Sequence, residues 1–289
     1  MEKVFEFDNV SNMEEIIQKT WDEFKFALKN KQFGYTDIDA AKEVTFLKVF
    51  DDLFGEHNGI KTLTKTIGDI KQKLGRGTIL KESEAVNYER FMPKKEFINE
   101  SNRFSPQGIE WLYIALEDDA TAIDTVKEEI RISKGERFGF CYFEFNENFH
   151  SNKIVDLTIA DKYTYADFNF ALEQFSQELI QRKAQQILST GVMPDDEHIL
   201  DKSEFVPFFM EWSIFTYCKL LSSQIFVPLE TDDKNLEYAP FQTLAQYFIT
   251  KGYGGIIYKS TVCKGGKNLV LFDKNMAHPR GNIIDEIIK

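Results

Sequence analysis

The segment RFSPQGIEWLY, residues 103–113, places a permanent positive charge a few residues before a tyrosine, with a turn between them. The guanidinium of Arg103 is a planar fork of N–H donors that matches two oxygens of a phosphate group. Tyr113 offers a flat aromatic face, which attracts a cationic ring. These two residue types could form part of a local cationic site for an anionic small ligand.

Carboxylates and a serine elsewhere in the chain complete a set of candidate reactive groups. Asp124 and Glu129 lie in TAIDTVKEEIR, and a carboxylate can stabilise developing positive charge or orient a nucleophile. Ser260 lies in YKSTV, and its hydroxyl can donate a hydrogen bond. No histidine partner for this serine is recognisable, so nucleophilic serine chemistry is not favoured. The purely structural alternatives are a solvent-exposed helix face for Glu129 and a position in the hydrophobic core for Tyr113.

Composition excludes several classes of function. The chain has 289 residues, of which 43% are hydrophobic, so it can bury a sizeable core. A formal net charge of −12 argues against nucleic-acid binding, which depends on Lys and Arg. The three cysteines and four histidines are scattered and form no zinc pattern, so no metal is expected. The N-terminus resembles no signal peptide and no apolar run spans a bilayer, so we expect a cytoplasmic protein without membrane contact.

The first 88 residues are predicted to form a helical accessory domain. Residues 11–31 begin with a capping box, Ser11 and Glu14, and continue with one apolar face. A second helix is predicted over residues 58–77, where Ile60 to Leu74 shows alternating apolar spacings of three and four. The domain break is expected near Pro93.

Residues 89–289 are predicted to form an α+β domain. Strands are expected in GIEWLYIAL, FGFCYFEF, KIVDLT, GGIIYKSTV and NLVLFD, and helices in TAIDTVKEEIR and FQTLAQYFITKGY. A helical insertion is expected at about residues 165–225, because residues 165–221 return to helical patterns that end in a long apolar segment.

Five segments in a fixed order carry a resemblance to a known family. They are RFSPQGIEWLYIA, TVKEEIR, IVDLT, YAPFQTLAQYF and GYGGIIYKSTVCKGGKNLVLFD. Together they resemble the RES domain, which is named for its Arg, Glu and Ser. The resemblance covers roughly residues 89–275, and the helices before it resemble the HEPN-related N-terminal domain of longer RES proteins.

The resemblance implies a fold like that of ADP-ribosyltransferases and an enzyme that degrades NAD, often as the toxin of a toxin-antitoxin pair. It matches Arg103 and Ser260 to catalytic positions of the family and assigns substrate binding to Tyr113, Gln242 and Tyr258. Ser260 is expected to hydrogen-bond the ribose or the nicotinamide amide of NAD. The acidic position falls on Glu129, which leaves the following EIRISKG in register. An alignment without a gap after Tyr113 places the acidic position on Asp124 instead.

The implied reaction cleaves the bond between nicotinamide and ribose through an oxocarbenium-like state. NAD is the substrate, no cofactor is expected, and either water or inorganic phosphate is the acceptor. A partner that restrains the activity, an antitoxin or immunity protein, follows from the resemblance, and a homodimer stays open.

The same sequence allows three alternative functions. Transfer of ADP-ribose to a macromolecule would need the same pocket. A non-catalytic RES fold would only bind a partner. Ribonuclease action by the N-terminal helices is weakly supported, because His57 has no arginine at the spacing that a HEPN site needs.

Overall fold

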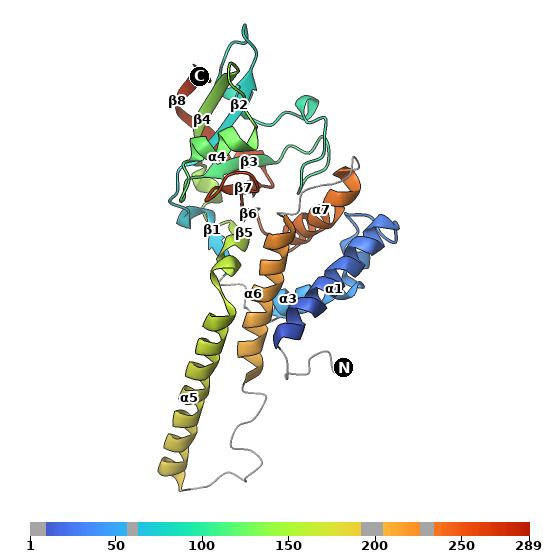
Figure 1. The fold of residues 1–289 in the computed structure, drawn as a ribbon, viewed down its shortest axis with the longest axis vertical. Coiled ribbons are helices and arrows are strands. Elements are labelled where there is room, and N and C mark those ends of the chain that lie inside the picture. Colours follow the sequence, from blue (N-terminus) through green and yellow to red (C-terminus); the bar gives the residue numbers. More distant parts are fainter. Residues whose placement is uncertain (1–9, 57–62, 192–204, 226–233) are drawn as a thin grey trace.

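The computed structural model describes residues 10–56, 63–191, 205–225 and 234–289. Helices form one end of the molecule and a mixed sheet the other (Figure 1). The described chain is therefore an α+β protein with a helical N-terminal region, which confirms the predicted fold class.

The N-terminal region contains helices α1 (Val10–Lys29), α2 (Ile38–Lys42) and α3 (Thr45–Glu56). The predicted apolar face of α1 is buried, at Ile17, Trp21, Phe24 and Leu28. The predicted capping box involves the side chain of Ser11, which lies outside the side chains that the structure describes.

The helix predicted over residues 58–77 is wrong. Residues 57–62 lie outside the described residues, and the remainder forms β1 (Thr64–Thr66), a 3-10 turn (Ile67–Asp69) and β2 (Leu74–Leu80). Strand pairing overrides the helical spacing. At Gly75 a β-carbon would lie 2.3 Å from the ring of Phe140, so the glycine permits close packing of that ring on the strand. The sheet thus begins before the predicted boundary at residue 88.

Eight strands form one sheet in the order β1-β5-β6-β7-β3-β2-β4-β8. Strands β5 and β6 pair in parallel, and the other neighbours pair antiparallel. The strands after β2 include all five predicted from the sequence, and they are β3 (Leu112–Leu116), β4 (Arg137–Phe145), β5 (Lys153–Asp156), β6 (Gly255–Lys259), β7 (Lys267–Leu271) and β8 (Ala277–Ile287).

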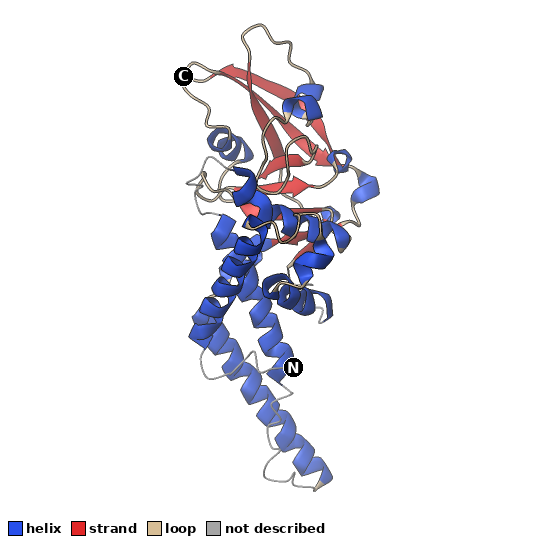
Figure 2. Cartoon of the chain, turned by 90° about the vertical axis from the view of Figure 1, so that its right-hand side faces the viewer, coloured by secondary structure: helices blue, strands red, loops and turns tan. Residues whose placement is uncertain are grey.

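Four helices accompany the sheet. They are α4 (Ala122–Glu129), α5 (Tyr165–Thr190), α6 (Val206–Ile225) and α7 (Lys234–Thr250). Helices α5 and α6 confirm the predicted helical insertion, and α5 extends away from the sheet as a long arm (Figures 1 and 2). No helix in the described ranges combines the length and apolar character needed to cross a membrane.

The largest core is shared between the N-terminal helices and the rest of the molecule. Trp21 and Phe46 from the first helices, Tyr217 from α6 and Phe248 from α7 belong to one buried cluster, which also includes Val270 of the sheet. Helices α1 to α3 therefore complete the core beneath α6 and α7 instead of enclosing a separate core of their own.

Candidate active site

The register of four adjacent strands creates an open area on the sheet. Tyr258 of β6 pairs with Asn268 of β7, Asn268 pairs with Ala115 of β3, and Ala115 pairs with Gly75 of β2. Directly paired residues point to the same face of a sheet. All four residues line one cavity, although the ring of Phe140 fills the space directly against Gly75.

A cavity of about 490 Å³ lies there, within the range of typical small-molecule pockets. Its walls come from the four strands, from the end of α4, from the loop at residues 100–103 and from Tyr238 of α7. Four of the predicted site residues line it: Arg103, Tyr113, Glu129 and Tyr258. These residues are distant in sequence, and the fold brings them to one cavity.

Glu129 is the last residue of α4, where the helix end delivers its carboxylate to the cavity. Its Oε1 accepts hydrogen bonds from Ser260 Oγ at 2.7 Å and from Asn268 Nδ2 at 2.5 Å. Its Oε2 accepts none from any described residue. One oxygen is therefore held by two donors, and the other is left for a ligand or a water molecule.

Ser260 is 5% exposed and lies beside Glu129 rather than on the wall of the cavity. Its Oγ accepts backbone N–H bonds from Cys263 at 2.9 Å and Val262 at 3.3 Å, which orient the hydroxyl proton toward Glu129. The expected contact of this serine with the ribose or the nicotinamide amide does not fit this position. Its geometry suits a positioning residue for Glu129.

Arg103 carries a buried donor without a partner. Its Nη1 atom is inaccessible to solvent and makes no hydrogen bond with the described residues. The guanidinium carbon lies 5.5 Å from the ring centres of Tyr238 and Phe241. Burial lowers the pKa of Arg103, while Tyr238, Tyr258 and Glu129 oppose the shift. Aromatic faces hold this cation without accepting hydrogen bonds from its N–H groups, and its side chain forms part of the cavity wall.

Helix α7 positions Arg103 through one of its faces. Phe241 and Gln242 follow Tyr238 by three and four residues, so both neighbour it on the helix surface. Gln242 is 4% exposed, and its Nε2 donates to the carbonyl of Asn102 at 3.2 Å. It does not line the cavity, so the predicted substrate contact of Gln242 is not seen, and it fixes the loop that carries Arg103.

The N-terminal helices support the same wall. Phe241 lies 5.5 Å, between ring centres, from Trp21 of α1 and 6.2 Å from Phe104. A continuous aromatic contact thus leads from α1 to the guanidinium of Arg103.

Two of the three tyrosines that line the cavity, Tyr113 and Tyr258, are neutral groups in this site. Burial raises the pKa of Tyr113, whose hydroxyl lies 2.9 Å from Ser105 Oγ. Burial also raises the pKa of Tyr258, with Tyr113 and Glu129 adding to the shift. Both side chains therefore present aromatic surface and an uncharged hydroxyl to the cavity.

Asp124 does not reach the cavity. It is exposed in the first turn of α4, where its Oδ2 accepts from Thr121 Oγ1 at 2.6 Å and its backbone N–H donates to the same hydroxyl. This arrangement caps the helix. The geometry favours Glu129 over Asp124 as the acidic residue of the candidate site.

Several lining residues were missed from the sequence. They are Arg76, Arg131, Tyr238 and Asn268. Arg76 was hidden in the segment wrongly predicted as helix, and its Nη1 donates to the Tyr113 carbonyl at 3.2 Å. Burial, with the nearby charge of Arg90, lowers the pKa of Arg76 to about 10, so it remains a cation at neutral pH. Asn268 follows the hairpin turn after Ser260, a position that register alone reveals.

Comparison with known proteins gives one match. Residues 208–286 match the family model of the RES domain, which confirms the predicted resemblance over those residues. The match includes Gln242, Tyr258, Ser260 and Asn268, whereas Arg103 and Glu129 lie outside it. No curated protein and no solved structure matches the chain.

Proposed function

We propose that this RES-domain chain cleaves NAD between nicotinamide and ribose. The proposal rests above all on one observation: one cavity is lined by Arg103, whose buried Nη1 has no partner among the described residues, and by Glu129, whose Oε2 has no donor among them. The match to the RES domain is consistent with an enzyme that acts on NAD.

The cationic residues suit the pyrophosphate of NAD. Arg103 would bind its oxygens with the unpaired N–H groups, and Arg76 adds a second positive charge in the same cavity. A turn of the side chain toward the cavity would let a bound anion give the buried Nη1 atom the partner that it lacks among the described residues. The site thus has a reason to bind phosphate that is independent of family resemblance.

Glu129 would act at the ribose. When the C1′–N bond breaks, its electron pair goes to the nicotinamide nitrogen, which leaves as neutral nicotinamide, and positive charge develops on the ribose. A carboxylate held by Ser260 and Asn268 stabilises that charge, and Oε2 can accept a proton from an attacking water. The products are then ADP-ribose, nicotinamide and one proton.

Inorganic phosphate is the second acceptor to consider. Attack of a phosphate oxygen at C1′ gives ADP-ribose 1″-phosphate and nicotinamide. The cavity contains three arginines, Arg76, Arg103 and Arg131, so it has cationic groups beyond the one assigned to the pyrophosphate. Either acceptor is compatible with this arrangement.

A product assay on the purified chain tests the proposal. NAD is incubated with and without inorganic phosphate, and nicotinamide, ADP-ribose and ADP-ribose 1″-phosphate are separated by chromatography. Free ADP-ribose indicates hydrolysis, and the 1″-phosphate indicates phosphorolysis. If nicotinamide is released only when a protein acceptor is added, transfer to a macromolecule replaces our proposal. If no nicotinamide forms at all, catalysis on NAD is wrong.

The proposed biological role is a toxin or defence effector that depletes NAD. It is carried by the resemblance to the RES domain and not by the geometry of the site. Expression from a tightly repressed promoter tests it, with cellular NAD and growth measured against the Glu129→Gln variant. NAD loss and growth arrest with the wild-type chain alone are expected.

A further inference from the structure

A second concave region lies on the N-terminal helices. A groove of about 1050 Å³ runs between α1 and α6, with Val44 also in its lining. Its apolar lining includes Ile17, Ala27 and Leu220, and Phe26 stands in it with 64% of its surface exposed. An aromatic side chain this exposed in a groove is a typical anchor position for a protein partner.

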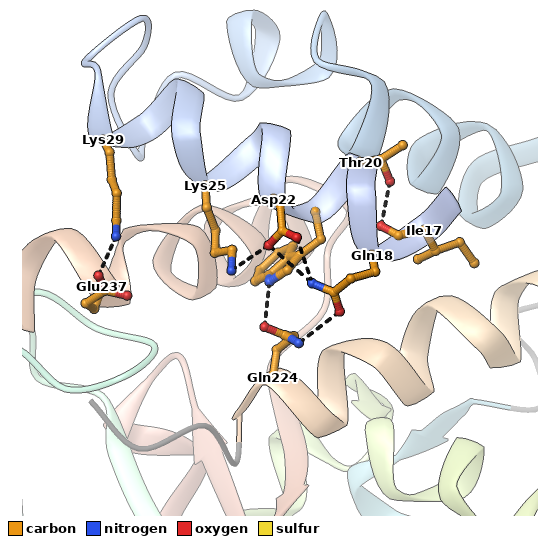
Figure 3. Close-up of polar contacts among 9 residues, drawn as sticks. Ile17, Gln18, Thr20, Asp22, Lys25, Lys29, Gln224 and Glu237 are labelled. Carbon is orange, nitrogen blue, oxygen red and sulfur yellow. Dashed lines mark hydrogen bonds and ion pairs between the residues drawn. The ribbon is translucent and has the colours of Figure 1, made fainter. Parts of the chain in front are cut away.

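Acidic groups surround this apolar lining. Glu14, Glu15, Asp22 and Glu23 all line the groove, against two lysines. Asp22 pairs with Lys25 at 2.8 Å and accepts from Gln18 (Figure 3). The three glutamates make no ion pair with any described residue. The groove therefore has a net negative rim that the described residues do not neutralise.

The floor of the groove is preformed. Trp21 Nε1 donates to Gln224 Oε1 at 3.1 Å, and Gln224 Nε2 donates to Gln18 Oε1 at 3.2 Å (Figure 3). This network links α1 to α6 beneath the groove and fixes the spacing of the two helices. A ligand would meet a surface that needs little rearrangement on binding.

We propose that this groove binds a basic amphipathic helix of a partner protein. A groove with a helix on each side accepts a third helix, whose apolar residues would pack on Phe26 and Leu220. Lys and Arg on the flanks of that helix would meet the unpaired glutamates of the rim. The surface lies apart from the NAD cavity, with no lining residue in common, and the inference does not depend on the proposed reaction.

A peptide titration on the full-length chain tests the proposal. The probe is a fluorescently labelled 20-residue peptide of Leu and Lys at helical spacing, and a Leu/Glu peptide of the same pattern is the reference. Anisotropy measures binding at low and raised salt. We expect the Leu/Lys peptide to bind, with affinity that falls as salt rises, and the Leu/Glu peptide not to bind.

Two groove variants and one matched control give the test its specificity. Glu15→Lys/Glu23→Lys reverses the rim charge, and Phe26→Ala removes the exposed anchor. Each should weaken peptide binding by about tenfold or more. Glu173→Lys/Glu178→Lys makes the same change of net charge on exposed positions of α5 and should bind as the wild type does. Circular dichroism confirms that all three variants are folded.

Three outcomes would overturn the proposal. Equal weakening by the α5 control would mean that the peptide responds to overall charge and not to the groove. Unchanged binding by both groove variants would place the peptide elsewhere. Sedimentation without peptide adds a third arm: a dimer that Phe26→Ala dissociates would make the groove a contact between two copies of this chain, and the partner proposal would be wrong.

Discussion

Ser260 Oγ lies 2.7 Å from Glu129 Oε1, although 131 residues separate the two in the chain. The serine belongs to the turn after β6 and the glutamate to the end of α4, and Asn268 of β7 donates to the same oxygen. The carboxylate is thus oriented by two neutral donors, one in the turn after β6 and one on β7. This relationship underlies the first two predictions.

Glu129→Gln should lower kcat for NAD cleavage by about 10²- to 10⁴-fold, because the neutral amide cannot stabilise the ribose cation or accept a proton. Asp124→Asn should keep nearly full activity and cost at most about 1 kcal/mol of stability, because Asp124 only caps α4. Initial rates of nicotinamide release compare the two. Activity retained by Glu129→Gln but lost in Asp124→Asn would reverse the assignment.

Ser260→Ala should reduce kcat by roughly 10- to 100-fold with little change in KM, since a hydrogen bond to a charged group contributes about 1.5–3 kcal/mol. Asn268→Ala should act in the same direction, because it removes the other donor to Glu129. The double variant should lose less than the sum of the two, as expected for residues that act on one atom. Complete loss in Ser260→Ala alone, with Asn268→Ala fully active, would instead indicate a direct catalytic role for the serine.

Arg103→Met should abolish NAD binding yet leave the free energy of unfolding unchanged or raise it by up to about 1 kcal/mol. The substitution removes a buried N–H without a partner, and this gain is partly offset by lost contacts with Tyr238 and Phe241. Urea unfolding measures stability, and a thermal shift on adding NAD measures binding.

Arg137→Met is the control for this comparison. Arg137 pairs with Asp285 and donates to the carbonyls of Lys81 and Glu82, so its loss should destabilise the fold while NAD binding persists. A large loss of stability in Arg103→Met would show that this arginine is structural.

Asp51 should contribute stability that disappears in acid. Partial burial would raise its pKa, but hydrogen bonds from Lys251 and Tyr247 lower it below 3.8 overall. A carboxylate whose pKa is lower in the folded than in the unfolded protein stabilises the fold at pH values above the unfolded pKa. This stabilisation is lost as the pH falls through the folded pKa. Asp51→Asn should therefore cost about 1 kcal/mol at pH 7, and its difference from the wild type should shrink below about pH 3.8. Asp52→Asn, at the exposed neighbouring position, should show neither effect in urea unfolding across pH.

A chain that starts at residue 63 should fail to fold cooperatively. It lacks α1 to α3, which share a core with α6, α7 and the sheet, so large aromatic residues such as Tyr217 and Phe248 would be exposed. Thermal unfolding followed by circular dichroism tests this, and co-expression of residues 1–62 should restore the folded state. A sharp transition in the shortened chain alone would support an independent N-terminal domain, as the sequence first suggested.

The sequence by itself determined the α+β class, helix α1 with its buried face, the helical insertion and strands β3 to β7, because these depend on local periodicity. It also identified Arg103, Tyr113, Glu129 and Tyr258, which line one cavity. Local spacing failed at residues 64–80, where pairing with β3, β4 and β5 turned an apparent helix into strands.

Only the tertiary structure decided how the candidate residues divide their tasks. Strand register placed Asn268 beside Glu129, and the packing of α7 on the loop at residues 100–103 made Gln242 a support for Arg103. Helix capping removed Asp124 from the site. These outcomes depend on contacts between residues far apart in the chain, and no local pattern records which distant partner a side chain will meet.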